Sequence, residues 1–77
     1  METELLKRIT INPGIFNGKP IIRGMRFTVT DVLDLLSSGM TPEEIIEDFP
    51  FLEKEDIKAS LLYASLRLKN TVIINAA

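Results

Sequence analysis

Residues 39–45 read Gly-Met-Thr-Pro-Glu-Glu-Ile and contain the clearest helix start in the chain. Thr41 and Glu44 are spaced as a capping box, in which each side chain accepts a hydrogen bond from the backbone N–H of the other residue. Pro42 suits the first helical position, because an N–H there would have no partner within the helix. We therefore predict a short helix that starts after Thr41 and is stopped by Pro50.

A further helix is expected on each side of this one. Before it, Thr30 is predicted as an N-cap with Asp31 in the first turn, where a carboxylate favours the helix dipole, and this helix ends near Gly39. After it, the longest helical pattern runs over residues 53–70, and its predicted core face consists of Ile57, Leu61, Ala64 and Leu68. Three helices in this order predict a homeodomain-like, helix-turn-helix bundle.

Residues 1–30 are predicted to form a small β element. Residues 8–11 alternate polar and apolar side chains, which is typical of a short strand. Residues 17–20 form a turn that needs a positive φ at Gly18, and Gly24 suits a tight reversal between two brief apolar stretches. The expected fold is therefore mostly α, with an N-terminal β-hairpin-like segment followed by the three-helix bundle.

The chain is expected to be one domain. It has 77 residues, and a chain of this length buries only about 60% of the surface that it exposes when unfolded. It has no Cys and no His to supply a disulfide or a zinc site, so we expect a partner subunit and a homodimer. The predicted parts are the β element at 1–30, the bundle at 31–70 and an apolar tail at 71–77.

The composition disfavours catalysis. The absence of His and Cys removes the side chains on which most acid-base and nucleophilic mechanisms depend. Glu43 and Glu47 share a helix face, but a solvated face explains them better than a metal site. We expect no enzyme activity, cofactor, metal or small-molecule substrate. No apolar run reaches about 20 residues and the first residues do not form a secretory signal, so we expect a cytoplasmic protein without a membrane segment.

The charges are segregated along the chain. Bases dominate residues 1–30, whereas residues 31–56 carry nine carboxylates and one cation, Lys54. The third helix opens with Glu-Lys-Glu-Asp at 53–56, which phosphates would repel. Contacts to nucleic acid are therefore expected from the β element, through Arg8, Lys19, Arg23 and Arg26. The alternative is a solvated acidic face with scattered surface bases.

The C-terminal part is the expected surface for a protein partner. The predicted contact residues are Tyr63, Leu66, Val72, Ile73 and Ile74. Core packing is the alternative for the two helical residues. The last three are β-prone and apolar, and an unpaired terminal strand needs another strand beside it.

Several of these segments carry a family resemblance. Residues 17–29 read Asn-Gly-Lys-Pro-Ile-Ile-Arg-Gly-Met-Arg-Phe-Thr-Val; together with residues 9–13, 39–45 and 49–50 they resemble the domain of unknown function 433. The resemblance covers about residues 8 to 65. It implies a homeodomain-like three-helix fold and a similarity to the antitoxin half of VapBC-type toxin–antitoxin pairs, whose partner is commonly a PIN-like nuclease toxin. The sequence departs from the family pattern at Glu53, where a Ser or Thr usually caps the third helix.

Two functional hypotheses follow. The first, implied by the resemblance, is a DNA-binding antitoxin that neutralises a PIN-like toxin and represses its own operon. The alternative is a protein-interaction domain without DNA binding, which the acidic start of the third helix favours.

Overall fold

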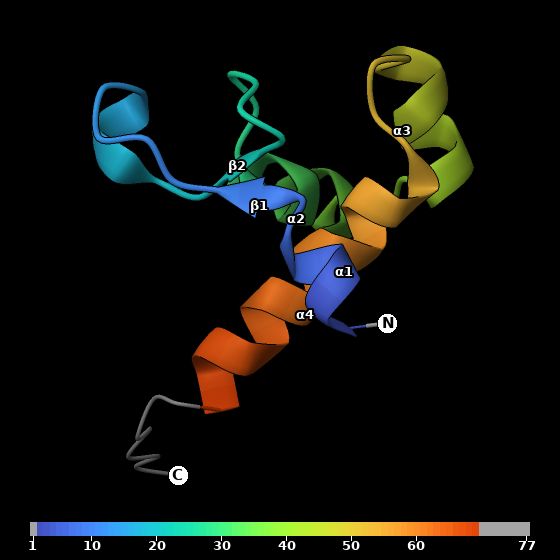
Figure 1. Ribbon diagram of the computed structural model, residues 1–77. Helices are drawn as coiled ribbons and strands as arrows, with labels where there is room; N and C mark the ends of the chain where they lie inside the picture. The colour runs from blue at the N-terminus through green and yellow to red at the C-terminus, as the bar shows by residue number, and fades with distance from the viewer. Residues whose placement is uncertain (1, 70–77) are drawn as a thin grey trace, which may run out of the picture.

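The computed structural model describes residues 2–69 (Figure 1). It is a small, mostly helical domain in which a two-stranded antiparallel sheet precedes three helices, and this confirms the predicted fold class. The elements in chain order are α1 (Glu2–Leu6), β1 (Ile9–Thr10), the short turn η1 (Phe16–Gly18), β2 (Ile21–Ile22), α2 (Val29–Ser37), α3 (Pro42–Asp48) and α4 (Lys54–Lys69).

Helix α2 starts two residues earlier than predicted. Its N-cap is Thr28, whose Oγ1 accepts a hydrogen bond from the Asp31 N–H at 2.9 Å, while Asp31 Oδ2 accepts one from the Thr28 N–H at 2.9 Å. The prediction of Thr30 as the cap was wrong because Thr30 has Leu33, not an acid, three residues later. A carboxylate at the third helical position therefore decides which of the two threonines caps the helix.

Helix α3 has the predicted capping box. The Glu44 N–H donates to Thr41 Oγ1 at 3.1 Å, and the Thr41 N–H donates to Glu44 Oε1 at 2.8 Å. Pro42 is the first residue of the helix and Phe49 is its C-cap.

Helix α1 was not predicted, so residues 1–30 are not only a β element. This helix has five residues, and so short a helix is marginal by itself in water. Leu5 and Leu6 are half-buried, and α1 packs against α4. The contact with α4 stabilises α1, and no local sequence pattern announces that contact.

Two turns position the strands. Gly18 has a φ of 79°, as predicted. At the tight reversal after β2, Arg23 and Gly24 have φ values of 45° and 72°, and the Met25 N–H donates to the Ile22 carbonyl at 2.8 Å. Positive φ at both central residues is the geometry of a type I′ turn. This turn holds Arg23 in a conformation that non-glycine residues seldom adopt.

The core lies where β2, α2, α3 and the first half of α4 meet. Its fully buried cluster consists of Ile22, Val29, Val32, Ile45, Leu52 and Ile57. No helix within residues 2–69 has the length and apolar content needed to cross a membrane.

The core stops partway along α4. The buried residues of this helix are Asp56, Ile57, Ala59 and Ser60. Leu61 and Leu68 are 49% and 61% exposed, so their predicted place in the core was wrong. Figure 1 shows the reason, because the second half of α4 extends beyond the other elements.

Candidate functional site

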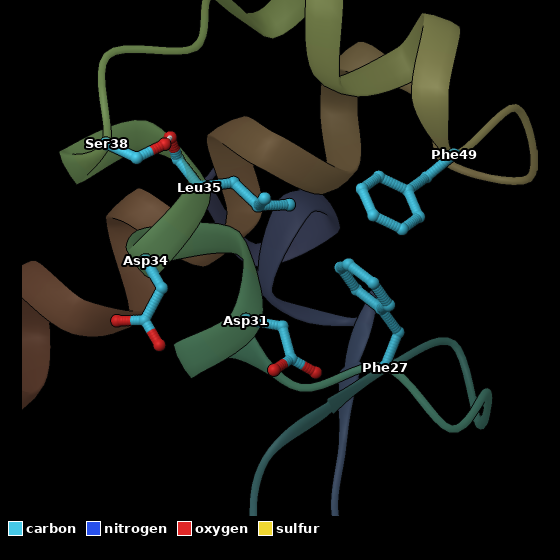
Figure 2. A pocket seen from close by; sticks show the side chains of 6 residues that line it. All are labelled: Phe27, Asp31, Asp34, Leu35, Ser38 and Phe49. Carbon is cyan, nitrogen blue, oxygen red and sulfur yellow. Dashed lines mark hydrogen bonds between the residues drawn. The ribbon is translucent and has the colours of Figure 1, made fainter.

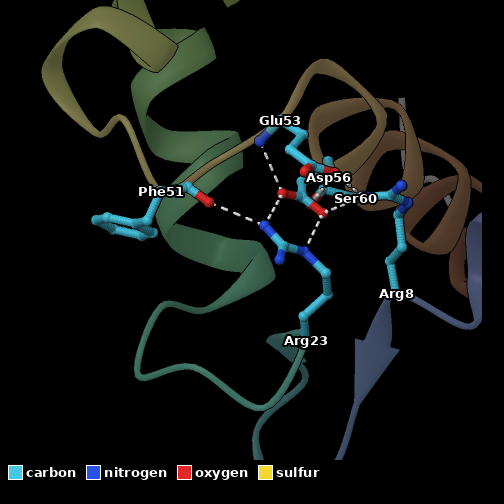
Figure 3. A network of polar contacts seen from close by, with 6 residues as sticks. All are labelled: Arg8, Arg23, Phe51, Glu53, Asp56 and Ser60. Atoms are coloured by element: carbon cyan, nitrogen blue, oxygen red, sulfur yellow. Dashed lines mark hydrogen bonds and ion pairs between the residues drawn. The ribbon is translucent and has the colours of Figure 1, made fainter.

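The most strongly connected polar group of the domain is the Asp56 carboxylate (Figure 3). Its residue is fully buried in the first turn of α4. Oδ1 accepts hydrogen bonds from Arg23 Nε and Arg8 Nη1, both at 3.0 Å. Oδ2 accepts from Arg23 Nη2 and from the Glu53 N–H, both at 2.8 Å. Asp56 thus accepts the N–H of Glu53 as the acid of a capping box does. The reciprocal hydrogen bond would need a Ser or Thr at position 53, where this chain has Glu53.

Two more bonds extend this network. Arg23 Nη2 also donates to the Phe51 carbonyl at 2.8 Å, and Arg8 Nη1 donates to Glu53 Oε1 at 2.6 Å. The network therefore joins the residue before β1, the turn after β2, the α3–α4 connection and the start of α4. Within residues 2–69 every buried side-chain nitrogen and oxygen has a hydrogen-bond partner.

The electrostatics keep all three principal groups charged. Burial by itself raises the pKa of Asp56, but the hydrogen bonds from Arg23, the Glu53 N–H and Arg8 outweigh it and hold that pKa below its usual value. The pKa of Arg8 is raised by its hydrogen bonds to Glu53 and Asp56, and that of Arg23 by its hydrogen bond to Asp56. Asp56 is therefore a structural anchor and not a proton donor near neutral pH.

This network occupies two of the four residues that the sequence suggested for nucleic acid. The side chains of Arg8 and Arg23 are only 28% and 33% exposed, and both point to Asp56. Lys19 and Arg26 are exposed, and neither forms an ion pair with another residue of the 2–69 segment. Nucleic-acid contact by the four residues stays a prediction, and the structure gives two of them a structural partner.

The predicted partner surface is only partly described. Tyr63 is half-buried against the core, and Leu66 is half-buried. Val72, Ile73 and Ile74 lie outside the described residues. Leu61 and Leu68, which the sequence placed in the core, are the exposed leucines of this helix.

A pocket that was not predicted from the sequence lies between α2 and the C-terminal end of α3 (Figure 2). It has a volume of about 360 Å³ and is lined by Phe27, Asp31, Asp34, Leu35, Ser38 and Phe49. The rings of Phe27 and Phe49 lie 5.0 Å apart, centroid to centroid, and Phe51 packs on both. Asp31, Asp34 and Leu35 of α2 and its C-cap Ser38 have the spacing i, i+3, i+4 and i+7 of one helix face, and this spacing is the signal by which they could have been grouped.

These features define a small helical domain held together by a buried ion-pair network, with a mainly apolar pocket beside it that also contains two acids. Residues 9–64 match the model of the family described as "Protein of unknown function (DUF433)", and the chain belongs to this family. The chain is 36% identical over 56 residues to "Uncharacterized protein y4eO" of Sinorhizobium fredii (strain NBRC 101917 / NGR234). That match covers 73% of this chain but only 25% of the relative, so the chain spans about a quarter of that protein's length. No solved structure matches the chain.

Proposed function

We propose that this chain is a non-catalytic protein-binding module of the antitoxin type, and that a partner protein docks on the outer face of α4. The observation that carries the proposal is the exposure of Leu61 and Leu68, at 49% and 61%. The outer face of α4 is defined here by these two leucines.

The arrangement of α4 supports a partner there. Leu61 and Leu68 are seven residues apart, so they lie on one side of the helix, two turns from each other. Leu62 and Leu66 between them are only half-buried, and no described residue of α4 after Ser60 is fully buried. A helix that carries leucines on its outer side, beyond the end of its own core, is suited to the groove of another protein.

The partner class comes from the family resemblance. An antitoxin of the VapB type would bind a PIN-like nuclease toxin, and a helix inserted in an apolar groove is a common way to hold such a partner. The exposed acids Asp31 and Asp34 of α2 and Glu47 and Asp48 of α3, which form no ion pair within residues 2–69, favour this protein-binding role over contact of that surface with DNA.

The test is co-purification of the full chain with a PIN-like protein, which the proposal expects to be encoded beside its gene. Leu61→Asp combined with Leu68→Asp should weaken the complex by about 1,000-fold, because each buried apolar anchor is worth about 2 kcal/mol and 1.4 kcal/mol corresponds to a factor of about ten. The matched control is Ile11→Asp combined with Phe16→Asp, which changes two exposed apolar residues near the β element and should bind within threefold of wild type. Equal binding by the two double variants would refute the proposed surface.

The mass of the isolated chain in solution tests whether a second copy of the chain, and not a different protein, occupies the outer face of α4. If the wild type is a dimer by light scattering and the α4 variant is a monomer, a second copy of the chain occupies this face. That result would contradict the proposal of a different protein as its partner.

DNA binding is the second candidate function, and the exposure of two cations near β2 favours it. Lys19 and Arg26 are exposed on the loops that flank β2, and these loops project away from the second half of α4 (Figure 1). Both cations are available to phosphates, which makes binding salt-dependent.

Fluorescence anisotropy with the upstream promoter DNA, at low and physiological salt, tests this candidate. Lys19→Glu combined with Arg26→Glu should abolish salt-sensitive binding. Lys7→Glu combined with Lys54→Glu makes the same charge change at two bases that already pair with acids, and should retain most of the affinity. No binding by the wild type at either salt would leave the protein-binding module without a DNA role.

A further inference from the structure

The pocket between α2 and α3 combines an apolar wall with two acids. Phe27 precedes α2 and Phe49 follows α3, and Figure 2 shows their rings next to each other, tilted by 53°, with the Leu35 side chain directed toward them. Asp31 and Asp34 come from the adjoining face of α2. We propose that this pocket binds one arginine side chain of a partner protein.

The charge of the pocket favours a cationic ligand. Asp31 and Asp34 are three residues apart on α2, so two like charges lie on one helix face, an arrangement that is mildly destabilising without a cation. Neither forms an ion pair with any other residue between 2 and 69. The neighbouring helix α3 adds Glu43, Glu44 and further acids, which raises the local concentration of positively charged partners.

The two carboxylates have different tasks. Asp31 Oδ2 accepts the hydrogen bond of the Thr28 N–H at 2.9 Å, which fixes the orientation of that side chain. Asp34 is exposed, and no hydrogen bond is formed by its side-chain oxygens within the described chain. Both oxygens of Asp34 are therefore available for the paired N–H donors of a guanidinium group.

The apolar wall selects the shape of the cation. The Phe27 and Phe49 rings and Leu35 offer a surface for the aliphatic stem of a long side chain, and the faces of aromatic rings attract a cation, most often arginine. The volume of about 360 Å³ is near the lower end of the range of about 300–1,000 Å³ for ligand pockets. It suits one side chain better than a nucleotide. A planar guanidinium group can stack on one aromatic ring and also bind the paired oxygens of Asp34, which an ammonium group cannot do.

The probe is N-acetyl-arginine amide, titrated into the ¹⁵N-labelled full chain and followed by two-dimensional NMR. Saturable shifts are expected at the amides of residues 27–38 and 49. The isosteric but uncharged N-acetyl-citrulline amide should produce less than a fifth of these shifts at the same concentration.

Two variants localise the effect. Asp34→Asn should weaken binding of the arginine probe at least fivefold, whereas Asp48→Asn removes the same charge from an exposed acid outside the pocket and should change it less than twofold. Folding of each variant is checked by its unperturbed spectrum. Equal binding of citrulline, shifts that spread over all acidic residues without saturation, or equal effects of the two variants would overturn the proposal.

Discussion

Asp56→Ala is expected to be among the most destabilising single substitutions of a polar residue in this domain. The carboxylate is fully buried and accepts four hydrogen bonds, three of them from the guanidinium groups of Arg8 and Arg23. Removing one partner of a buried ion pair costs about 3–5 kcal/mol, because the other charges lose their compensation. Both arginine side chains are about a third exposed, so water compensates part of this loss. We therefore expect a loss near the lower limit, about 3 kcal/mol.

This loss is large for so small a domain. At about 0.05–0.15 kcal/mol per residue, a chain of 77 residues has a free energy of unfolding of about 4–12 kcal/mol. With a urea m value near 1 kcal/mol/M, the unfolding midpoint should fall by about 3 M without a change in m. Asp56→Asn keeps the shape and one oxygen acceptor but removes the charge and turns an NH2 donor toward two N–H donors, so its expected loss is about 2–3 kcal/mol.

Urea unfolding followed by far-UV circular dichroism measures both variants. The control is Glu47→Gln, which removes a carboxylate from an exposed position on α3 and should stay within about 0.5 kcal/mol of wild type. A loss below about 1 kcal/mol for Asp56→Ala would refute the reasoning, because the buried carboxylate would then contribute no more than a surface acid.

Three further predictions concern the same network and the start of α2. Arg23→Lys should lower the free energy of unfolding in urea by about 1–2 kcal/mol, because an ammonium group cannot reproduce the contact of two guanidinium nitrogens with Asp56. An unchanged free energy of unfolding would contradict a stabilising role of this two-nitrogen contact. The pKa of Asp56 is held below its usual value, so its contribution to stability is complete above about pH 3.9 and is lost as the pH falls through the folded-state pKa. Urea midpoints measured from pH 7 down to pH 3 should therefore decline more for wild type than for Asp56→Asn, and parallel declines would exclude this linkage. Thr28→Ala should cost about 1 kcal/mol and Thr30→Ala less than about 0.5 kcal/mol by thermal unfolding, with the reverse order pointing to Thr30 as the cap.

Most local elements of the fold could be predicted from the sequence, apart from α1 and the exact cap of α2, whereas the contacts between distant residues could not. The capping box of Thr41 and the positive φ of Gly18 depend on neighbouring residues, and both predictions were confirmed. Asp56 belongs to a run of acids and Arg23 to a basic segment, so in the sequence both have the pattern of surface charges. They are 33 residues apart, and only the folded chain brings them within 2.8 Å.

The second half of α4 was misjudged for a related reason. Periodicity identifies the apolar stripe of a helix, but it does not say how far along the helix the rest of the domain extends. Ile57 and Leu61 belong to the same predicted stripe, yet one is 2% exposed and the other 49%. The pocket was missed because Phe27 and Phe49 lie 22 residues apart in sequence and meet the acids of α2 only in the folded domain.

The ion-pair network also changes what the segregated charges mean for partners. Arg8 and Arg23 are neutralised by Asp56 and Glu53, and Lys7 pairs with Glu4, so few of the bases of residues 1–30 remain for an external anion. Of the nine carboxylates in residues 31–56, Glu53 and Asp56 are used internally, which leaves seven against the single cation of that segment. The surface around α2 and α3 is therefore more acidic, relative to the rest of the domain, than the overall net charge of −2 suggests. Such a surface repels phosphates and attracts basic side chains, so a protein ligand that presents an arginine is better matched to it than a nucleic acid.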